Sequence, residues 1–175
     1  MNIIRAHYKD QACFYKIGNF ICNYVDVNTV IVCIGTDRCI GDSLGPLVGT
    51  FLTEKNFPLP IYGTISDPIH ALNIDRKLTE IKYAHPNAKI IAIDACLGHE
   101  NNIGEIHARD CPIQPGKGVG KKLPPVGESS IIAIVDSSEN NIFSNTRIRL
   151  DFIFKLANAI TQALFLGYES KKAKS

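Results

Sequence analysis

Apolar runs of strand length alternate along the chain with segments of helical spacing. The runs are nearly continuous and rich in β-branched residues, which is typical of strands covered on both faces. They occupy 29–34, 61–65, 89–95 and 131–136. Amphipathic spacing predicts helices at 11–24, from Pro46 to about Lys55, at 71–84 and at 144–168. A more polar run at 104–110 follows its predecessor without a helix, so we expect an antiparallel strand at the edge of the sheet.

This alternation predicts an α/β fold with right-handed crossovers between mostly parallel strands. We expect a three-layer α/β/α arrangement, in which helices cover both faces of the sheet. The length of 175 residues suits one domain, which we take to span residues 1–175. The basic segment at about 169–175 is interpreted as a frayed, solvated tail.

One connecting loop carries the first candidate for chemistry. The chain reads GTDRCIGDSLGP over 35–46, directly after the strand predicted at 29–34. Gly35 ends that strand, and Pro46 suits the first turn of the next helix. Asp42 or Ser43 is a candidate cap for the helix. The loop therefore carries carboxylates to the start of a helix.

The expected strand order brings a second carboxylate to the same place. We expect the order 61–65, 29–34, 89–95, and ligands bind such sheets beyond the carboxyl ends of the strands. Asp42 then faces Asp94, which follows the apolar residues of the third of these strands, across a crevice. Their side-chain oxygens are expected within roughly 8 Å of each other, which leaves room for a shared water. His70 lies at the same edge, one strand farther away.

The two aspartates occupy unlike environments. Burial at the end of an apolar strand raises the pKa of Asp94, whereas N–H groups at a helix start favour the ionised form of Asp42. Such a pair suits acid–base chemistry, in which one carboxyl holds a proton while the other activates water. The residues leave an alternative open, in which Asp42 is only a helix cap and Asp94 only a loop residue.

A glycine-rich segment, PGKGVGKK at 115–122, is the second candidate loop. It does not fit a Walker loop, because Pro115 and Lys122 stand where that motif requires Gly and Ser or Thr. We expect a loop that lines the crevice, with Lys117 and Lys121 meeting substrate carbonyls or acidic side chains.

Composition narrows the functional classes. A net charge of +2 gives no support to a nucleic-acid partner, and none of the six cysteines forms a CxxC pair. No run approaches the roughly 20 apolar residues of a membrane helix, and the first residues lack a signal-peptide core. We expect a cytoplasmic protein without a membrane partner, a cofactor or a stoichiometric metal; its oligomeric state stays open.

Four segments together are characteristic of a known group of proteins. They are VCIGTDRCIGDSLGPLVG, DPIHALN, IIAIDACLG and IQPGKGVGKKLPPVGESSIIAIVD. Over about residues 28–165 the chain resembles the YyaC-type sporulation proteins, relatives of the germination protease that degrades small acid-soluble spore proteins. Hydrogenase maturation peptidases are similar more distantly. The resemblance implies a single spore-protease-like domain with a phosphorylase/hydrolase-like fold, located in the cytoplasm of a sporulating cell.

The resemblance also implies roles for particular residues. The two aspartates considered catalytic in the germination protease correspond to Asp42 and Asp94, and acidic residues at these positions help to hold a metal in the hydrogenase peptidases. Gln114 replaces a histidine of the protease, and the histidine that completes the metal site has no counterpart. The carboxylate pair therefore carries over, whereas substrate recognition and metal binding do not. The candidate substrate-binding residues are Gly35, Asp37, Gly41, His70, Gln114, Gly116, Lys117 and Gly118.

Three hypotheses follow from the sequence. The first is an endopeptidase that uses Asp42 and Asp94 on a water molecule to cleave a protein or peptide, with small acid-soluble spore proteins as candidate substrates. The second is an inactive module that grips a peptide tail through the 115–127 loop. The third is a metal-dependent maturation peptidase, with Asp42, Asp94 and His70 around a divalent ion. The sequence does not determine which aspartate is the acid.

Overall fold

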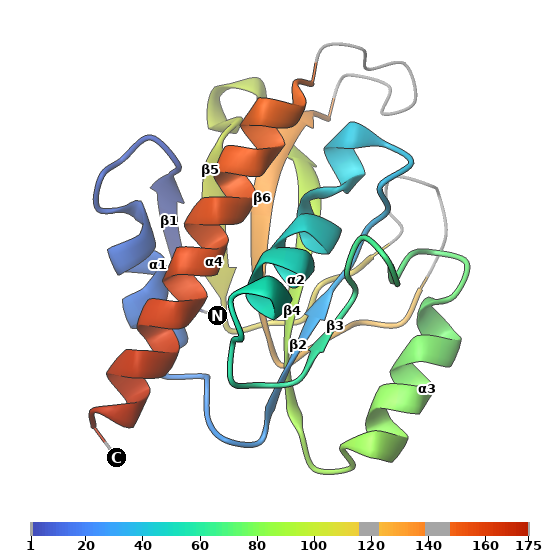
Figure 1. Ribbon diagram of the computed structural model, residues 1–175. Coiled ribbons are helices and arrows are strands. Elements are labelled where there is room, and N and C mark those ends of the chain that lie inside the picture. The colour runs from blue at the N-terminus through green and yellow to red at the C-terminus, as the bar shows by residue number, and fades with distance from the viewer. Residues whose placement is uncertain (1, 116–122, 139–147, 175) are drawn as a thin grey trace.

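The computed structural model describes residues 2–115, 123–138 and 148–174, and within them the chain forms an α/β fold. Figure 1 shows the arrangement of its mixed six-stranded sheet and four α-helices. The strands are β1 (Ile3–His7), β2 (Thr29–Cys33), β3 (Ile61–Tyr62), β4 (Lys89–Gly98), β5 (Glu105–Arg109) and β6 (Ser129–Ser137). The helices are α1 (Cys13–Ile21), α2 (Leu44–Glu54), α3 (Ile74–Ala84) and α4 (Leu150–Lys172), with short 3-10 turns η1 (Ile40–Asp42) and η2 (Glu100–Asn102).

The sheet has the order β1-β5-β6-β4-β2-β3. The predicted central order is confirmed, because β2 lies between β3 and β4 and is parallel to both. β5 runs antiparallel to β6, as expected, but it is not an edge strand. β1 pairs with the outer side of β5 and is also antiparallel to it. The prediction of an edge at β5 is wrong, because β1 takes the edge position. The sequence analysis missed β1, since Ile3 and Ile4 stand side by side before Arg5 and do not alternate as strand residues do.

Residues alternate along the strands between two hydrophobic clusters. Ile91 and Ile93 of β4 pack with α1, α2 and α4, which Figure 1 shows lying together over the sheet. Ile90 and Ala92 belong to a second cluster, which contains residues of α3. Isolated bridge partners Ile113 and Val126 also belong to this second cluster. Apolar residues on both faces of the sheet are thus buried. The three-layer, phosphorylase-like description of the fold stays a prediction.

The ends of several elements differ from the pattern. β3 is two residues long rather than five, and α3 begins at Ile74, three residues after the predicted start. α4 begins at Leu150; the predicted residues 144–147 lie outside the described part of the chain. It continues to Lys172, so the segment interpreted as a frayed tail is partly helical, and that interpretation is wrong up to this residue.

α4 is also the one helix in the described residues with the length and apolar composition to cross a membrane. Its inner side chains, among them Ile153, Leu156 and Ile160, are fully buried in the first hydrophobic cluster. Core helices pass the same test of length and composition, and this burial accounts for the apolar character of α4.

Candidate functional site

Glycines let the 35–46 loop fold back tightly on the end of β2. Gly35 has a φ of +140°, and a Cβ there would lie 2.0 Å from the carbonyl oxygen of Asp42. A Cβ on Gly45 would lie 2.0 Å from the carbonyl oxygen of Ile34. The backbone N–H of Thr36 donates to the Asp42 carbonyl at 3.0 Å. These approaches require glycine and hold η1, with Asp42 as its last residue, against the strand end.

The start of α2 leaves Asp42 without a capping role. Ser43 occupies the N-cap position, but no side chain caps the helix. The Ser43 hydroxyl instead donates to the carbonyl oxygen of Ile40 at 2.7 Å. The predicted N-cap position of Ser43 is confirmed, but its side chain does not cap the helix, because its hydroxyl bonds to the 3-10 turn directly before α2. Pro46 lies in the first helical turn, as predicted.

Asp94 lies inside β4 rather than at its end, because β4 continues to Gly98. On one side it pairs with Ile132 of β6. On the other side β2 finishes beside it, where the Ile34 N–H donates to the Ile93 carbonyl at 2.7 Å. Asp94 thus lies where β2 leaves the sheet while β4 and β6 continue, and η1 contacts β4.

The electrostatics couple the two carboxyls. Burial raises the pKa of Asp42 to about 6, although the backbone N–H of Thr36 acts to lower it. Burial, and next the negative charge of Asp42, raise the pKa of Asp94 well above its ordinary range. The backbone N–H of Ala95 and the charge of Arg109 oppose this rise only in part. The two carboxyls are close enough to interact and differ in their affinity for a proton.

His70 lies beside the end of β2 on the side away from β4, so it is one strand farther from Asp94, as the sequence predicts. Ile69 forms a parallel bridge with Ile34, and its carbonyl accepts the N–H of Gly35 at 2.8 Å. The ring is oriented by the Leu72 N–H, which donates to its Nδ1 at 3.2 Å. An acceptor at Nδ1 leaves Nε2 to carry the proton of the neutral ring.

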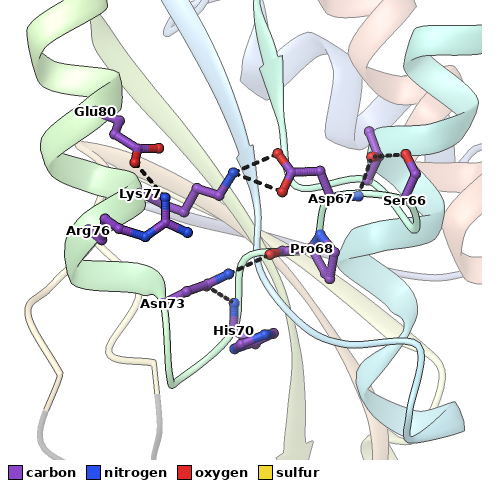
Figure 2. A network of polar contacts seen from close by, with 9 residues as sticks. Ser66, Asp67, Pro68, His70, Asn73, Arg76, Lys77 and Glu80 are labelled. Atoms are coloured by element: carbon purple, nitrogen blue, oxygen red, sulfur yellow. Dashed lines mark hydrogen bonds and ion pairs between the residues drawn. The ribbon is translucent and has the colours of Figure 1, made fainter.

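A polar network holds the turn that carries His70 (Figure 2). The Asn73 side chain accepts the His70 N–H at 2.9 Å and donates to the Pro68 carbonyl at 2.9 Å. Lys77 of α3 reaches back to both carboxylate oxygens of Asp67, at 2.6 and 2.8 Å. The segment between β3 and α3 is thereby fixed to the first turns of α3.

The other candidate residues are dispersed. Gly41 is buried, and a Cβ there would meet Ile148. Asp37 and Gln114 are exposed, and nothing brings either to the carboxyl pair. The remaining candidates, Gly116, Lys117 and Gly118, lie outside the described residues, and so does Lys121. The bridge between Ile113 and Val126 nevertheless brings together the two ends of the segment that contains them.

Sequence reasoning missed two charged residues near the site. Asp136 is buried and is the second-to-last residue of β6, where its Oδ1 accepts the N–H of Ser137 at 2.8 Å. The run IIAIVD, which ends in aspartate as IIAID does, was the available signal. Arg109 on β5 acts on the charge of Asp94, and no sequence pattern links residues on β5 and β4.

Among the described residues, no group of three or more His, Cys, Asp or Glu side chains is arranged to hold a metal ion. One hollow of about 300 Å³ lies at the opposite edge of the sheet, between Val27–Val30 and Ala84–Ala88. A second, of about 320 Å³, lies between α3 and Pro124–Glu128. Neither of these hollows is lined by Asp42 or Asp94. The candidate site is therefore defined by the two carboxyl groups and the strand order, and not by a cavity.

Comparisons with known proteins agree on one family. Residues 5–163 match the family described as Protein of unknown function (DUF1256). The chain is also 45% identical over 141 residues to the uncharacterized protein YyaC of Bacillus subtilis (strain 168). That alignment covers 78% of this chain and 68% of the relative.

Proposed function

The chain belongs to the DUF1256 family, and from its site we propose that it is a peptidase in which Asp42 and Asp94 hydrolyse a peptide bond. The observation that supports this most is the coupling of two partly buried carboxyls with unlike proton affinities beside the end of β2. Acid–base pairs in enzymes are built in this way, by environments that separate two pKa values.

The pKa directions support a division of roles between the two aspartates. At neutral pH Asp42, with a pKa of about 6, is mostly ionised and acts as the base. Burial and the charge of Asp42 raise the pKa of Asp94 well above its ordinary range, and we propose that it holds a proton and acts as the acid. Asp42 takes a proton from water while the water oxygen bonds to the carbonyl carbon. The C–N bond then breaks, and Asp94 protonates the leaving amine, so one water yields one carboxyl and one amine.

The resemblance to the germination protease supports the rest of the proposal. We propose small acid-soluble spore proteins as substrates and the cytoplasm of a sporulating cell as the location. The phosphorylase/hydrolase-like, three-layer fold is part of the same proposal. His70 is proposed to bind substrate, because its ring is fixed beside the end of β2 with a proton on Nε2.

The decisive experiment is cleavage of a small acid-soluble spore protein by wild type, Asp42→Asn, Asp94→Asn and the double variant. Each single variant should lose about 10²-fold or more of the rate, the scale of general acid–base contributions. The double variant should lose little more, because the two groups serve one step. Asp75→Asn, an exposed aspartate on α3, is the matched control and should cleave like wild type.

Two results would contradict catalysis: unchanged cleavage in both folded single variants, or tight binding without cleavage by wild type. The second result would favour the inactive peptide-binding module. Elemental analysis of the purified protein tests the metal-dependent alternative. We expect less than stoichiometric zinc or nickel, because no three-ligand group exists in the described residues. About one ion per chain, lost in Asp94→Ala, would support that alternative instead.

A further inference from the structure

Arg109 lies on the same face of the sheet as Asp94. It pairs with Ser130 of β6, and Ser130 pairs with Ala92 of β4. Asp94 is two residues beyond Ala92, so its side chain emerges from the same face. The neighbouring strands β5, β6 and β4 thus carry Arg109, Ser130 and Asp94, respectively, on one face of the sheet.

Ser130 fixes the direction of the Arg109 side chain. The serine is fully buried, and its hydroxyl donates to the Cys111 carbonyl at 2.7 Å. Its lone pair is thereby turned to the arginine, whose Nε–H donates to the hydroxyl oxygen at 3.2 Å. An arginine held at Nε keeps its planar fork in one orientation.

The terminal nitrogens of Arg109 have donors to spare. Among the described residues, the Arg109 side chain makes one hydrogen bond, from Nε to the Ser130 hydroxyl, and it forms no ion pair. Arg109 is partly buried, and its positive charge acts on Asp94. A partly desolvated cation with unused donors, held in place by a buried serine, is a preorganised binder of oxygen atoms.

We propose that Arg109 is a catalytic residue whose Nη atoms donate to the carbonyl oxygen of the peptide bond that Asp42 and Asp94 hydrolyse. This inference rests on the proposed function. As the water oxygen bonds to the carbonyl carbon, the carbonyl π pair moves onto its oxygen, and the guanidinium stabilises that charge. The pair returns when the C–N bond breaks, and Arg109 keeps all its protons throughout.

Kinetics of Arg109→Met, Arg109→Lys and Ser130→Ala on a small acid-soluble spore protein test the role. Arg109→Met should lower kcat by about 10²–10³-fold and change KM less, as does loss of an oxyanion donor elsewhere. Arg109→Lys keeps the charge without the fork and should retain more activity than Arg109→Met. Ser130→Ala frees the guanidinium and should cost about 10-fold in kcat. Arg5→Met, an exposed arginine on the same face of β1, should match wild type.

A binding experiment separates this inference from the proposed function. The ¹⁵Nε signal of Arg109, assigned by its loss in Arg109→Met, should shift when the spore protein is added to Asp94→Asn, and the Arg5 signal should not. A shift without any cleavage by wild type would refute the peptidase and leave Arg109 as a ligand-binding residue. Absence of binding, or binding that leaves the Arg109 signal in place, would overturn the inference. A variant effect confined to a higher KM for acidic substrates would overturn the inference too. Arg109 would then bind an acidic side chain of the substrate and not the carbonyl oxygen of the cleaved bond.

Discussion

At Asp42, partial burial favours the neutral carboxyl, so ionisation of this side chain costs stability. Its pKa is raised from 3.8 to about 6, which corresponds to at most about 3 kcal/mol. The stabilising contribution of the neutral form is complete below about pH 4 and is lost as the pH rises through about 6.

Asp42→Asn should therefore raise the free energy of unfolding at pH 7 by about 1–3 kcal/mol relative to wild type. At pH 3.5 the two proteins should differ little, because both side chains are then neutral. Urea melts at both pH values measure the difference. The exposed Asp75→Asn serves as control and should not gain stability at pH 7. An equal effect of Asp42→Asn at both pH values would contradict the burial of the carboxyl.

The carboxyl pair was predictable from sequence, and its electrostatic partner was not. Asp42 and Asp94 follow apolar runs, and parallel strands bring such positions to one edge. The pairing of β2 with β4 confirms that step. Arg109 reaches this place only because β5 folds back antiparallel beside β6. The partner of Asp94 thus depends on a strand pairing that no local pattern encodes.

At the scale of elements, the turn between β3 and α3 depends on Asn73 more than on the ion pair beside it. Asn73 makes two hydrogen bonds from a partly buried position. The pair of Lys77 with Asp67 includes a carboxylate that is 68% exposed, and exposed pairs contribute little.

Asn73→Ala should therefore cost about 1–2 kcal/mol of unfolding free energy and shift the amide resonance of His70. Lys77→Met should cost less than about 1 kcal/mol and leave that resonance in place. Urea melts and amide spectra of both variants provide the measurement. A larger loss in Lys77→Met than in Asn73→Ala would show that the ion pair holds the turn.

For the whole molecule, β1 covers the outer side of β5 and closes that part of the sheet. Ala6 is 6% exposed and belongs to the first hydrophobic cluster, whereas the neighbouring Arg5 is exposed on the other face. Ala6→Asp should lower the free energy of unfolding by about 3 kcal/mol or more, because it buries a carboxyl without a partner.

Arg5→Thr should change stability by less than about 0.5 kcal/mol, because surface replacements usually do. Thermal melts of the two variants measure the contrast. Equal stability of both variants would mean that β1 does not contribute to the core.

The sequence by itself determined the α/β class and the central order β3-β2-β4, and it predicted that Asp42 and Asp94 lie close together. Apolar periodicity and turn residues are local, and the rules of parallel crossovers convert them into a strand order. Only the tertiary structure decided that β1 takes the edge, that β4 runs past Asp94, and that Asp42 is free of a capping role. These features depend on which distant backbone groups find partners, and a hydrogen bond between segments far apart in the chain leaves no periodic trace in either one.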